Sequence, residues 1–207
     1  MLTHTYRFEY ATQANVVPTN LATKLCSALD VNCLSPDPNA PQPDSEGRVS
    51  FTVADNFTGF LEVSSDDTLP SLVFFQPPVI IPGSEKVIRL IREDEFLGLN
   101  AAAGQTWDQS RGVAVILTAN CNDERSAGIR VESDDIDADT VPYYFTGALP
   151  NPDAKKTDSQ GVAGFLNMPI GVINVRSYVF ENDVYIGTNT LRSRAGYLSY
   201  LPIGPSL

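Results

Sequence analysis

The residues best suited to chemistry form an acidic run from Glu132 to Thr140. Three of its carboxylates, Asp135, Asp137 and Asp139, alternate along the chain and could converge on a hard cation such as calcium, which binds oxygen ligands. An EF-hand loop requires glycine where Thr140 stands, so the run does not match that motif. We therefore expect weak calcium binding at most, or a solvated loop between two strands that binds no metal.

Aromatic side chains suggest a second kind of site. Trp107, Tyr143 and Tyr144 would form a stacking platform for a sugar ring if their faces were exposed and coplanar. Aromatic residues in the strands of a β-sandwich more often pack in the core or along an edge. The three residues are therefore candidates for ligand binding, with core packing as the alternative.

The sequence supplies few residues for catalysis. A serine or cysteine nucleophile needs an imidazole beside it, and the single histidine, His4, lies in an expected strand at the start of the chain. Iron dioxygenases with related folds need a second histidine, which is absent from the sequence. A pair among the 25 acidic residues would suit a glycoside hydrolase, but no pair stands in a recognisable context. We expect a protein that is not an enzyme and has no cofactor beyond weakly bound calcium, with a glycosidase as the remote alternative.

Two of the three cysteines, Cys26 and Cys33, are separated by six residues, which is wider than the spacing of a redox or zinc CxxC motif. Six residues allow the chain to fold back and bring the two Cα atoms to the roughly 5.5 Å that a disulfide needs. A disulfide would indicate an oxidising compartment, whereas two buried thiols are the alternative. We predict the bond, which leaves Cys121 as the odd thiol.

Charge and hydropathy limit the classes of partner that this chain is expected to bind. The chain has 207 residues, with 14 basic and 25 acidic side chains and a net charge of −11, and its basic residues are scattered, so we do not expect nucleic-acid binding. No stretch approaches the roughly 18 consecutive apolar residues of a membrane span. The first ten residues alternate like a strand and lack the pattern of a signal peptide. An unidentified protein or glycan is the expected partner.

The elements that must position these residues are short strands, and an internal repeat marks where some of them begin. Asp44–Gly47 and Asp158–Gly161 share the pattern Asp-Ser-x-Gly, in which the aspartate caps a turn and the glycine adopts a left-handed conformation. A second pair of glycines, Gly59 and Gly171, opens the next strand of each copy. A repeat at this distance predicts two tandem domains of one architecture.

The strand after each turn alternates between apolar and polar residues. Val49, Phe51 and Val53 alternate with polar residues in the first copy, and Ala163 and Phe165 take the same positions in the second. Each strand should therefore bury one face and expose the other. Phe51 and Phe165 are predicted to be equivalent core residues.

Further strands are expected in the second half of the chain, over 113–119, 128–132, 172–180, 184–191 and 196–201. The strand count is that of an immunoglobulin-like or transthyretin-like sandwich. Residues 93–104 have helical spacing, an acidic first turn and a glycine at the end, which predicts a short helix. The predicted fold class is all-β, with two tandem β-sandwich modules and a short connecting helix.

The second copy resembles the carboxypeptidase regulatory-like modules. In that family a Thr-Asp-x-x-Gly turn, a strand with an aromatic residue, an Asn-x-Pro-x-Gly turn and a closing strand recur in a transthyretin-like (prealbumin-like) sandwich. Here they correspond to Thr157–Gly161, Phe165, Asn167–Gly171 and Val172–Val175. The resemblance covers roughly residues 111 to 201.

The first copy departs from this pattern, because Pro43 replaces the threonine and residues 54–58 replace the Asn-x-Pro turn. Its segment Cys26–Cys33 resembles a variant found in tandem modules of secreted or lipid-anchored bacterial proteins of the myxobacterial type. The resemblance implies a structural, adhesive or ligand-binding role in a secreted or cell-surface protein, with no catalytic residues to transfer. A carbohydrate-binding module is the alternative.

The expected boundaries follow from the repeat and the helix. A first, divergent module is predicted over 1–91, a helical linker over 92–109 and a second module over 110–207. The break between Gly104 and Arg111 lies outside the strand set of the second module.

Overall fold

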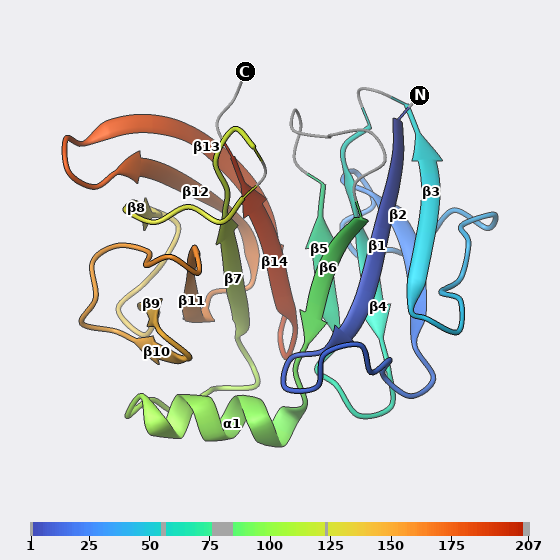
Figure 1. Cartoon of the computed structure of the whole chain (residues 1–207), viewed down its shortest axis with the longest axis horizontal. Coiled ribbons are helices and arrows are strands. Elements are labelled where there is room, and N and C mark those ends of the chain that lie inside the picture. The colour runs from blue at the N-terminus through green and yellow to red at the C-terminus, as the bar shows by residue number, and fades with distance from the viewer. Residues whose placement is uncertain (1, 55–56, 76–84, 123, 205–207) are drawn as a thin grey trace. The chain divides into compact units, whose positions relative to one another are not determined.

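A computed structural model describes residues 2–54, 57–75, 85–122 and 124–204. The chain divides into two compact units, Met1–Phe96 and Leu97–Leu207, referred to below as the first and the second unit. The described residues form strands and one helix, α1 (Glu93–Ala102), which contains the boundary between the units (Figure 1). The all-β class is therefore confirmed, and the helix begins where its acidic first turn predicted.

The first unit contains two groups of three strands. They are β1 (Leu2–Tyr10), β2 (Ala22–Ser27), β3 (Arg48–Val53), β4 (Gly59–Ser64), β5 (Ser71–Phe74) and β6 (Glu85–Leu90). In one group β1 lies between β3, to which it is antiparallel, and β6, to which it is parallel. In the other group β4 lies between β2 and β5 and is antiparallel to both.

The second unit contains eight strands. They are β7 (Gly112–Thr118), β8 (Ile129–Glu132), β9 (Val141–Thr146), β10 (Leu149–Asn151), β11 (Val162–Met168), β12 (Gly171–Val179), β13 (Val184–Ser193) and β14 (Leu198–Ile203). Strand β7 lies between antiparallel β11 and parallel β14. Strand β12 lies between β8 and β13 and is antiparallel to both. Strands β9 and β10 continue the sheet beyond β11.

Each strand of the first unit has a counterpart in the second. The order β3-β1-β6 matches β11-β7-β14 in neighbours and direction, and β2-β4-β5 matches β8-β12-β13. The register agrees as well, since Tyr6 lies opposite Val49 in the first unit and Ile116 lies opposite Ala163 in the second. The sequence repeat therefore marks one connectivity that occurs twice, with β9 and β10 added in the second unit.

The Asp-Ser-x-Gly turns of the two units share a hydrogen bond to the aspartate carboxylate. The carboxylates of Asp44 and Asp158 each accept a bond of 2.8 Å from the backbone N–H two residues later. Gly47 and Gly161 have φ values of 72° and 61°, which favour glycine. A Cβ there would lie 2.6 Å from a β1 carbonyl oxygen or 2.7 Å from a β7 carbonyl oxygen, so each turn also fits closely against the equivalent strand.

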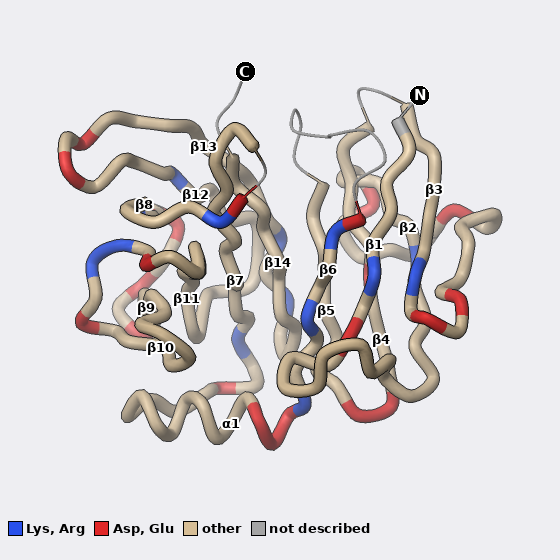
Figure 2. Tube along the Cα trace, in the orientation of Figure 1, with Lys and Arg blue, Asp and Glu red and all other residues tan. Residues whose placement is uncertain are grey.

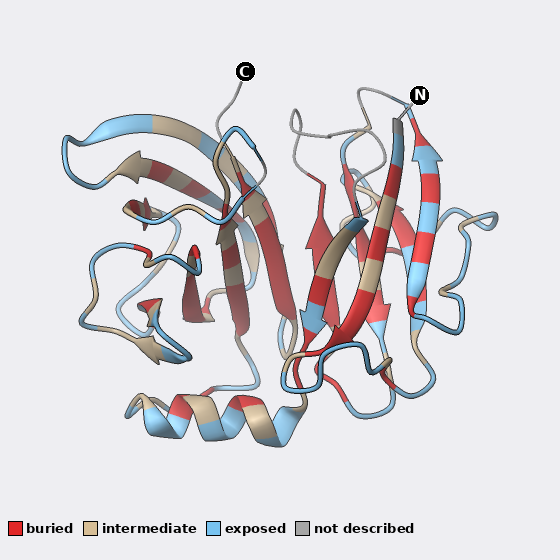
Figure 3. Ribbon diagram, in the orientation of Figure 1, coloured by how far each residue is buried: buried red, intermediate tan, exposed pale blue. Residues whose placement is uncertain are grey.

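The two cores are built from the inward positions that alternation predicted. Buried and exposed residues alternate along β3 (Figure 3). Phe51 and Phe165 are 5% and 1% exposed, which confirms both as core residues. The following strand of each unit also buries an equivalent pair of apolar residues, Leu61 with Val63 and Ile173 with Val175.

Candidate interaction site

The three aromatic candidates are core residues. Trp107, Tyr143 and Tyr144 are 8%, 8% and 5% exposed. The Tyr143 hydroxyl donates to the carbonyl oxygen of Ala114 at 2.9 Å, and the Tyr144 hydroxyl accepts from the backbone N–H of Val131 at 3.0 Å. Burial raises the pKa of both hydroxyls. These rings therefore do not form the exposed platform that a sugar-binding site would need, because all three are buried.

The acidic loop directs its carboxylates toward different partners. Asp135 accepts hydrogen bonds from the backbone and side-chain nitrogens of Asn174, at 2.8 and 3.0 Å. Asp137 accepts from Arg111 at 2.5 Å, and Asp139 lies 3.9 Å from the same guanidinium. Within the described residues no group of three or more histidine, cysteine or acidic side chains is placed to hold a metal ion. Weak calcium binding by this loop stays a prediction.

Arg111 links the acidic loop to the end of β11. Its guanidinium donates to Asp137 and, at 2.6 Å, to the carbonyl oxygen of Asn167. The Arg111 bond, together with a bond from the Thr140 hydroxyl, holds the pKa of Asp137 below its usual value. Asp137 therefore has a structural partner, which the sequence pattern of alternating carboxylates did not reveal.

The single histidine packs in the core of the first unit. The His4 ring lies 5.5 Å from that of Phe51 and 5.4 Å from that of Phe75, measured between centroids, and it is 8% exposed. Burial, followed by the positive charge of Lys86, lowers the pKa of His4. The imidazole therefore packs as part of the aromatic core of the first unit.

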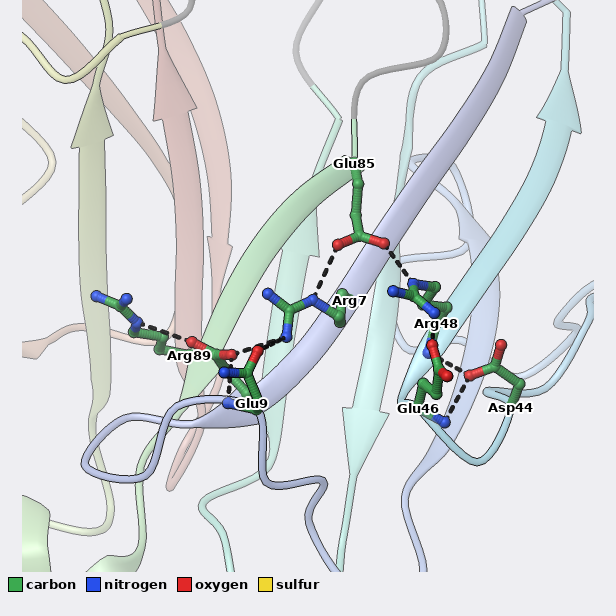
Figure 4. A network of polar contacts seen from close by, with 8 residues as sticks. Arg7, Glu9, Asp44, Glu46, Arg48, Glu85 and Arg89 are labelled. Atoms are coloured by element: carbon green, nitrogen blue, oxygen red, sulfur yellow. Dashed lines mark hydrogen bonds and ion pairs between the residues drawn. The ribbon is translucent and has the colours of Figure 1, made fainter.

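Charged side chains of alternating sign cross the outer face of the sheet formed by β3, β1 and β6 (Figure 4). The series, called the charge ladder below, joins side chains at 2.6 to 3.1 Å, in the order Arg48, Glu85, Arg7, Glu9, Arg89. The sequence pattern gave no sign of this ladder, because its members come from three strands that are distant in the chain.

Glu9 is the buried member of the charge ladder, at 2% exposure. Burial alone would raise its pKa, but the backbone N–H of Asn15 and the guanidiniums of Arg89 and Arg7 lower it below the usual value. A carboxylate with these donors is held ionised, so Glu9 is a poor general acid and a good anchor for the loop that contains Asn15.

Cys26 and Cys33 form a disulfide, with Cα atoms 5.4 Å apart. Cys26 lies near the end of β2, and both cysteines are buried. Cys121 is free and exposed. The bond closes a short loop against the end of a strand, as the spacing of the two cysteines allowed.

Asp30 stabilises the closed loop by accepting hydrogen bonds from three backbone N–H groups. Its carboxylate accepts the backbone N–H of Leu34 at 3.0 Å and that of Ser35 at 2.7 Å, while its carbonyl oxygen accepts the N–H of Cys33 at 2.9 Å. Cys33 has a φ of 53°, a left-handed conformation that the disulfide and these bonds hold in place. The loop is therefore fixed by covalent and hydrogen bonds rather than by a core of its own.

This loop, called the Cys26–Leu34 loop below, presents the two most exposed large apolar side chains of the described residues. Leu29 is 94% exposed and Leu34 is 80% exposed. No basic residue occurs between Leu25 and Gly47, whereas four acidic ones do. Two nearly fully exposed leucines on a loop held by a disulfide and hydrogen bonds could enter apolar pockets of a partner, so this loop is the candidate interaction site.

Sequence reasoning identified the cysteines of this site but missed its leucines. The available signal was their position, one within and one just after the cysteine-bracketed segment, where no strand alternation assigns them to a core. Loop residues without such a periodicity cannot be placed inside or outside from the sequence.

Comparisons with known proteins leave the family open. No family model matches the sequence, and no curated protein matches it. Similar solved structures include the Bacillus anthracis TIE protein (TM-score 0.32, 11% identity, 99% of this chain and 34% of that one). A streptococcal ancillary pilin has a TM-score of 0.31 and 13% identity, over 99% of this chain and 68% of that one. A minor pilin of Streptococcus agalactiae has a TM-score of 0.32 and 12% identity, over 100% of this chain and 96% of that one. This chain spans about a third of the first structure, and similarity at this level assigns neither a family nor a function.

The described part of the chain contains no helix that is long and apolar enough to span a membrane.

Proposed function

We propose that this chain is a non-catalytic structural or interaction module of a secreted or cell-surface protein, and that it contacts a protein partner through the Cys26–Leu34 loop. The observation that carries this proposal is the near-complete exposure of Leu29 and Leu34 on a loop fixed by a disulfide and by Asp30. The disulfide supports a location outside the reducing cytosol.

A rigid loop binds efficiently because little conformational entropy is lost when its side chains enter a pocket. Fully burying a leucine side chain contributes about 1.5 to 3 kcal/mol. Two leucines on one loop would therefore supply about 3 to 6 kcal/mol, or at least a roughly hundred-fold gain in affinity. The acidic stretch around the loop favours a partner whose apolar pocket has a basic rim.

A binding experiment with surface proteins of the organism that produces this chain tests this proposal. The partner is crosslinked to the wild-type chain, purified, and titrated against a Leu29→Ser, Leu34→Ser double variant. We expect affinity to fall by about 100-fold or more, with an unchanged circular dichroism spectrum. The matched control is Leu149→Ser in the second unit, where the side chain is 51% exposed, and it should bind like the wild type.

A Cys26→Ser, Cys33→Ser variant separates rigidity from contact, because it keeps both leucines and frees the loop. It should bind more weakly than the wild type and more tightly than the double leucine variant. Equal affinity of the wild type and the double leucine variant for the partner would contradict the proposal. Retention of the wild type and of both variants by the same glycans on an array would also contradict it.

A further inference from the structure

Strands β2 and β8 hold equivalent places at sheet edges in the two units. Among the described strands β2 pairs with β4 alone, and β8 pairs with β12 alone. The backbone N–H and C=O groups on the other side of an edge strand can pair with a strand of another chain. In both strands several of these groups are instead bonded within the same chain.

In the first unit the side-chain amide of Gln42 bonds both backbone groups of Thr23 on β2. Its Oε1 accepts from the Thr23 N–H at 3.2 Å, and its Nε2 donates to the Thr23 carbonyl oxygen at 2.9 Å. An amide side chain has an acceptor and a donor next to each other, as a peptide group does. Gln42 therefore bonds Thr23 as one residue of a neighbouring strand would.

Residues 37–42, called the covering segment below, lie along the same edge. The Asp37 N–H donates to the carbonyl oxygen of Leu25 at 2.9 Å, and the Thr23 hydroxyl donates to that of Pro41 at 3.3 Å. The partners on β2 fall from residue 25 to residue 23 as the segment rises from 37 to 42, so the two run antiparallel. The covering segment thus occupies the edge that a strand of another chain would need.

The covering segment offers few donors of its own to a further strand. Pro38 and Pro41 have no N–H. The N–H groups of Asn39 and Ala40 are bonded to the carboxylate and the carbonyl oxygen of Asp37, at 2.9 and 3.1 Å. Because prolines and bonded N–H groups discourage strand pairing, the segment covers one edge without creating another.

In the second unit the β8 edge is closed at two alternate residues. The Thr157 N–H donates to the carbonyl oxygen of Ile129 at 2.9 Å, and the Ile129 N–H donates to the Thr157 hydroxyl at 3.0 Å. That hydroxyl donates in turn to the carbonyl oxygen of Ser126 at 2.9 Å. The Tyr144 hydroxyl bonds the N–H and the carbonyl oxygen of Val131, at 3.0 and 3.3 Å.

We propose that Gln42 and Thr157 are edge caps, which keep β2 and β8 from pairing with a strand of another chain. Both lie just before the Asp-Ser-x-Gly turn, Gln42 two residues before Asp44 and Thr157 one residue before Asp158. The first unit has Pro43 at the position of Thr157, and proline has neither a hydroxyl nor an N–H. The amide of the preceding residue therefore supplies the bonds that threonine supplies in the second unit.

The β2 edge depends more on its cap than the β8 edge does. Strand β2 has six residues and one charged side chain, Lys24, whereas β8 has four residues, two of which are charged (Figure 2). Shortness and charge discourage strand addition by themselves. Loss of the Gln42 side chain should therefore promote association more than loss of the Thr157 hydroxyl. This inference concerns the sheet edges and is independent of the partner proposed for the Cys26–Leu34 loop.

Amide hydrogen exchange on the full chain tests the cap on β2. Gln42→Ala removes both bonds to Thr23, so we expect the Thr23 amide to exchange about ten-fold faster than in the wild type. The amides of β4 should keep their protection, which shows that the unit stays folded. Asn39→Ala is the matched control, since Asn39 lies in the covering segment and bonds through its backbone N–H. An unchanged rate at Thr23 in the Gln42→Ala variant would overturn the cap.

Two substitutions of Thr157 test the cap on β8 in the same way. Valine keeps the shape of threonine without its hydroxyl, so in Thr157→Val the Ile129 amide should exchange about five-fold faster. Thr157→Ser keeps the hydroxyl and should leave that rate near the wild-type value. The amides of β7 report whether the unit stays folded. Equal rates at Ile129 in the two variants would overturn the role of the hydroxyl.

Sedimentation velocity over a roughly hundred-fold concentration range tests the consequence for association. In a purified sample the other chains available to a released edge are copies of the protein itself. We expect Gln42→Ala to associate with rising concentration, while the wild type and Asn39→Ala change little over the same range. Thr157→Val should associate less than Gln42→Ala. A Gln42→Ala variant that sediments like the wild type at every concentration would overturn the proposal that the cap prevents strand pairing.

Discussion

The two units share one connectivity but are stabilised by different means. The first unit has a disulfide, a histidine packed among aromatic rings and the charge ladder on its outer face. The second unit has one cysteine, which is free, and it contains the additional strands β9 and β10. Its acidic loop is held by the bond between Arg111 and Asp137. The shared parts include the Asp-Ser-x-Gly turns and the alternating strands that follow them.

The differences lie outside that shared frame. The candidate interaction loop follows β2 in the first unit, whereas the long β12–β13 hairpin belongs to the second. Loops and edges can change without disturbing a core, so the two copies of one fold can present different surfaces. The experiments below test whether the stability of each unit depends on its own stabilising interactions.

The largest effect is expected from core truncation. Phe165 is 1% exposed, and Phe165→Ala should destabilise the second unit by about 3 to 5 kcal/mol through the lost transfer free energy and the cavity left behind. Phe51→Ala should act likewise on the first unit. Chemical denaturation measures both changes, and Phe180→Ala, at a position that is 37% exposed, is the control that should cost much less. A change below about 1 kcal/mol for Phe165→Ala would contradict its central place in the core.

Removing the disulfide should affect the first unit alone. A closed loop of this length stabilises the folded state by about 2 to 3 kcal/mol in the chain-entropy account. The Cys26→Ser, Cys33→Ser variant should therefore lower the midpoint of urea unfolding for the first unit. Reduction of the wild type should reproduce the shift, and Cys121→Ser should cause none. A shift confined to the second unit would be inconsistent with this account.

The equivalent glycines offer a matched comparison of the two turns. Gly47→Ala and Gly161→Ala should each cost about 1 to 3 kcal/mol, because both positions have positive φ and a Cβ would meet backbone atoms below 3.0 Å. Gly128→Ala is the control, since its φ is 77° but nothing lies within 4 Å of the added Cβ. Thermal unfolding should rank the control as the mildest of the three. A control as costly as the other two would show that strain alone, and not close packing, fixes these glycines.

Acid should weaken the first unit before the second. Burial lowers the pKa of His4, so between the usual histidine pKa of about 6.5 and that lowered value the unfolded chain binds more protons than the folded one. Stability of the first unit should therefore fall as the pH decreases from about 7 to 5. Denaturation at both pH values measures it, and His4→Phe should remove the fall. The chain has one histidine, so an equal fall in the second unit would point to another group.

The smallest effect concerns the acidic loop of the second unit. Calcium at a concentration near a millimolar dissociation constant would stabilise that unit by only about 0.4 kcal/mol. Calorimetry should show weak binding or none, since Arg111 and Asn174 already bond to Asp137 and Asp135. Micromolar affinity, lost in an Asp135→Asn, Asp139→Asn variant, would show that the loop rearranges around the ion.

Sequence reasoning was strongest where a local pattern determines structure. The strands with Phe51 and Phe165, the turns at Gly47 and Gly161, and the helix begun by Glu93 all follow from periodicity or turn chemistry. The strands β2, β5 and β9 were missed because they lack clear alternation.

The candidate site was harder to predict. Trp107, Tyr143 and Tyr144 were candidates for an exposed platform, yet whether such a residue is buried depends on which elements pack against it, which a single sequence does not encode locally. Arg111 meets Asp137 across a distance in sequence that no motif spans. The leucines of the Cys26–Leu34 loop became candidates only through their exposure.

Amide hydrogen exchange on the full-length Phe51→Ala variant tests the central claim, which is that one connectivity occurs twice with a separate core in each unit. The account predicts faster exchange in β1, β3 and β4 of the first unit, while β7, β11 and β12 of the second unit keep the protection they have in the wild type. Loss of protection in both units together would show a single shared core and contradict the account.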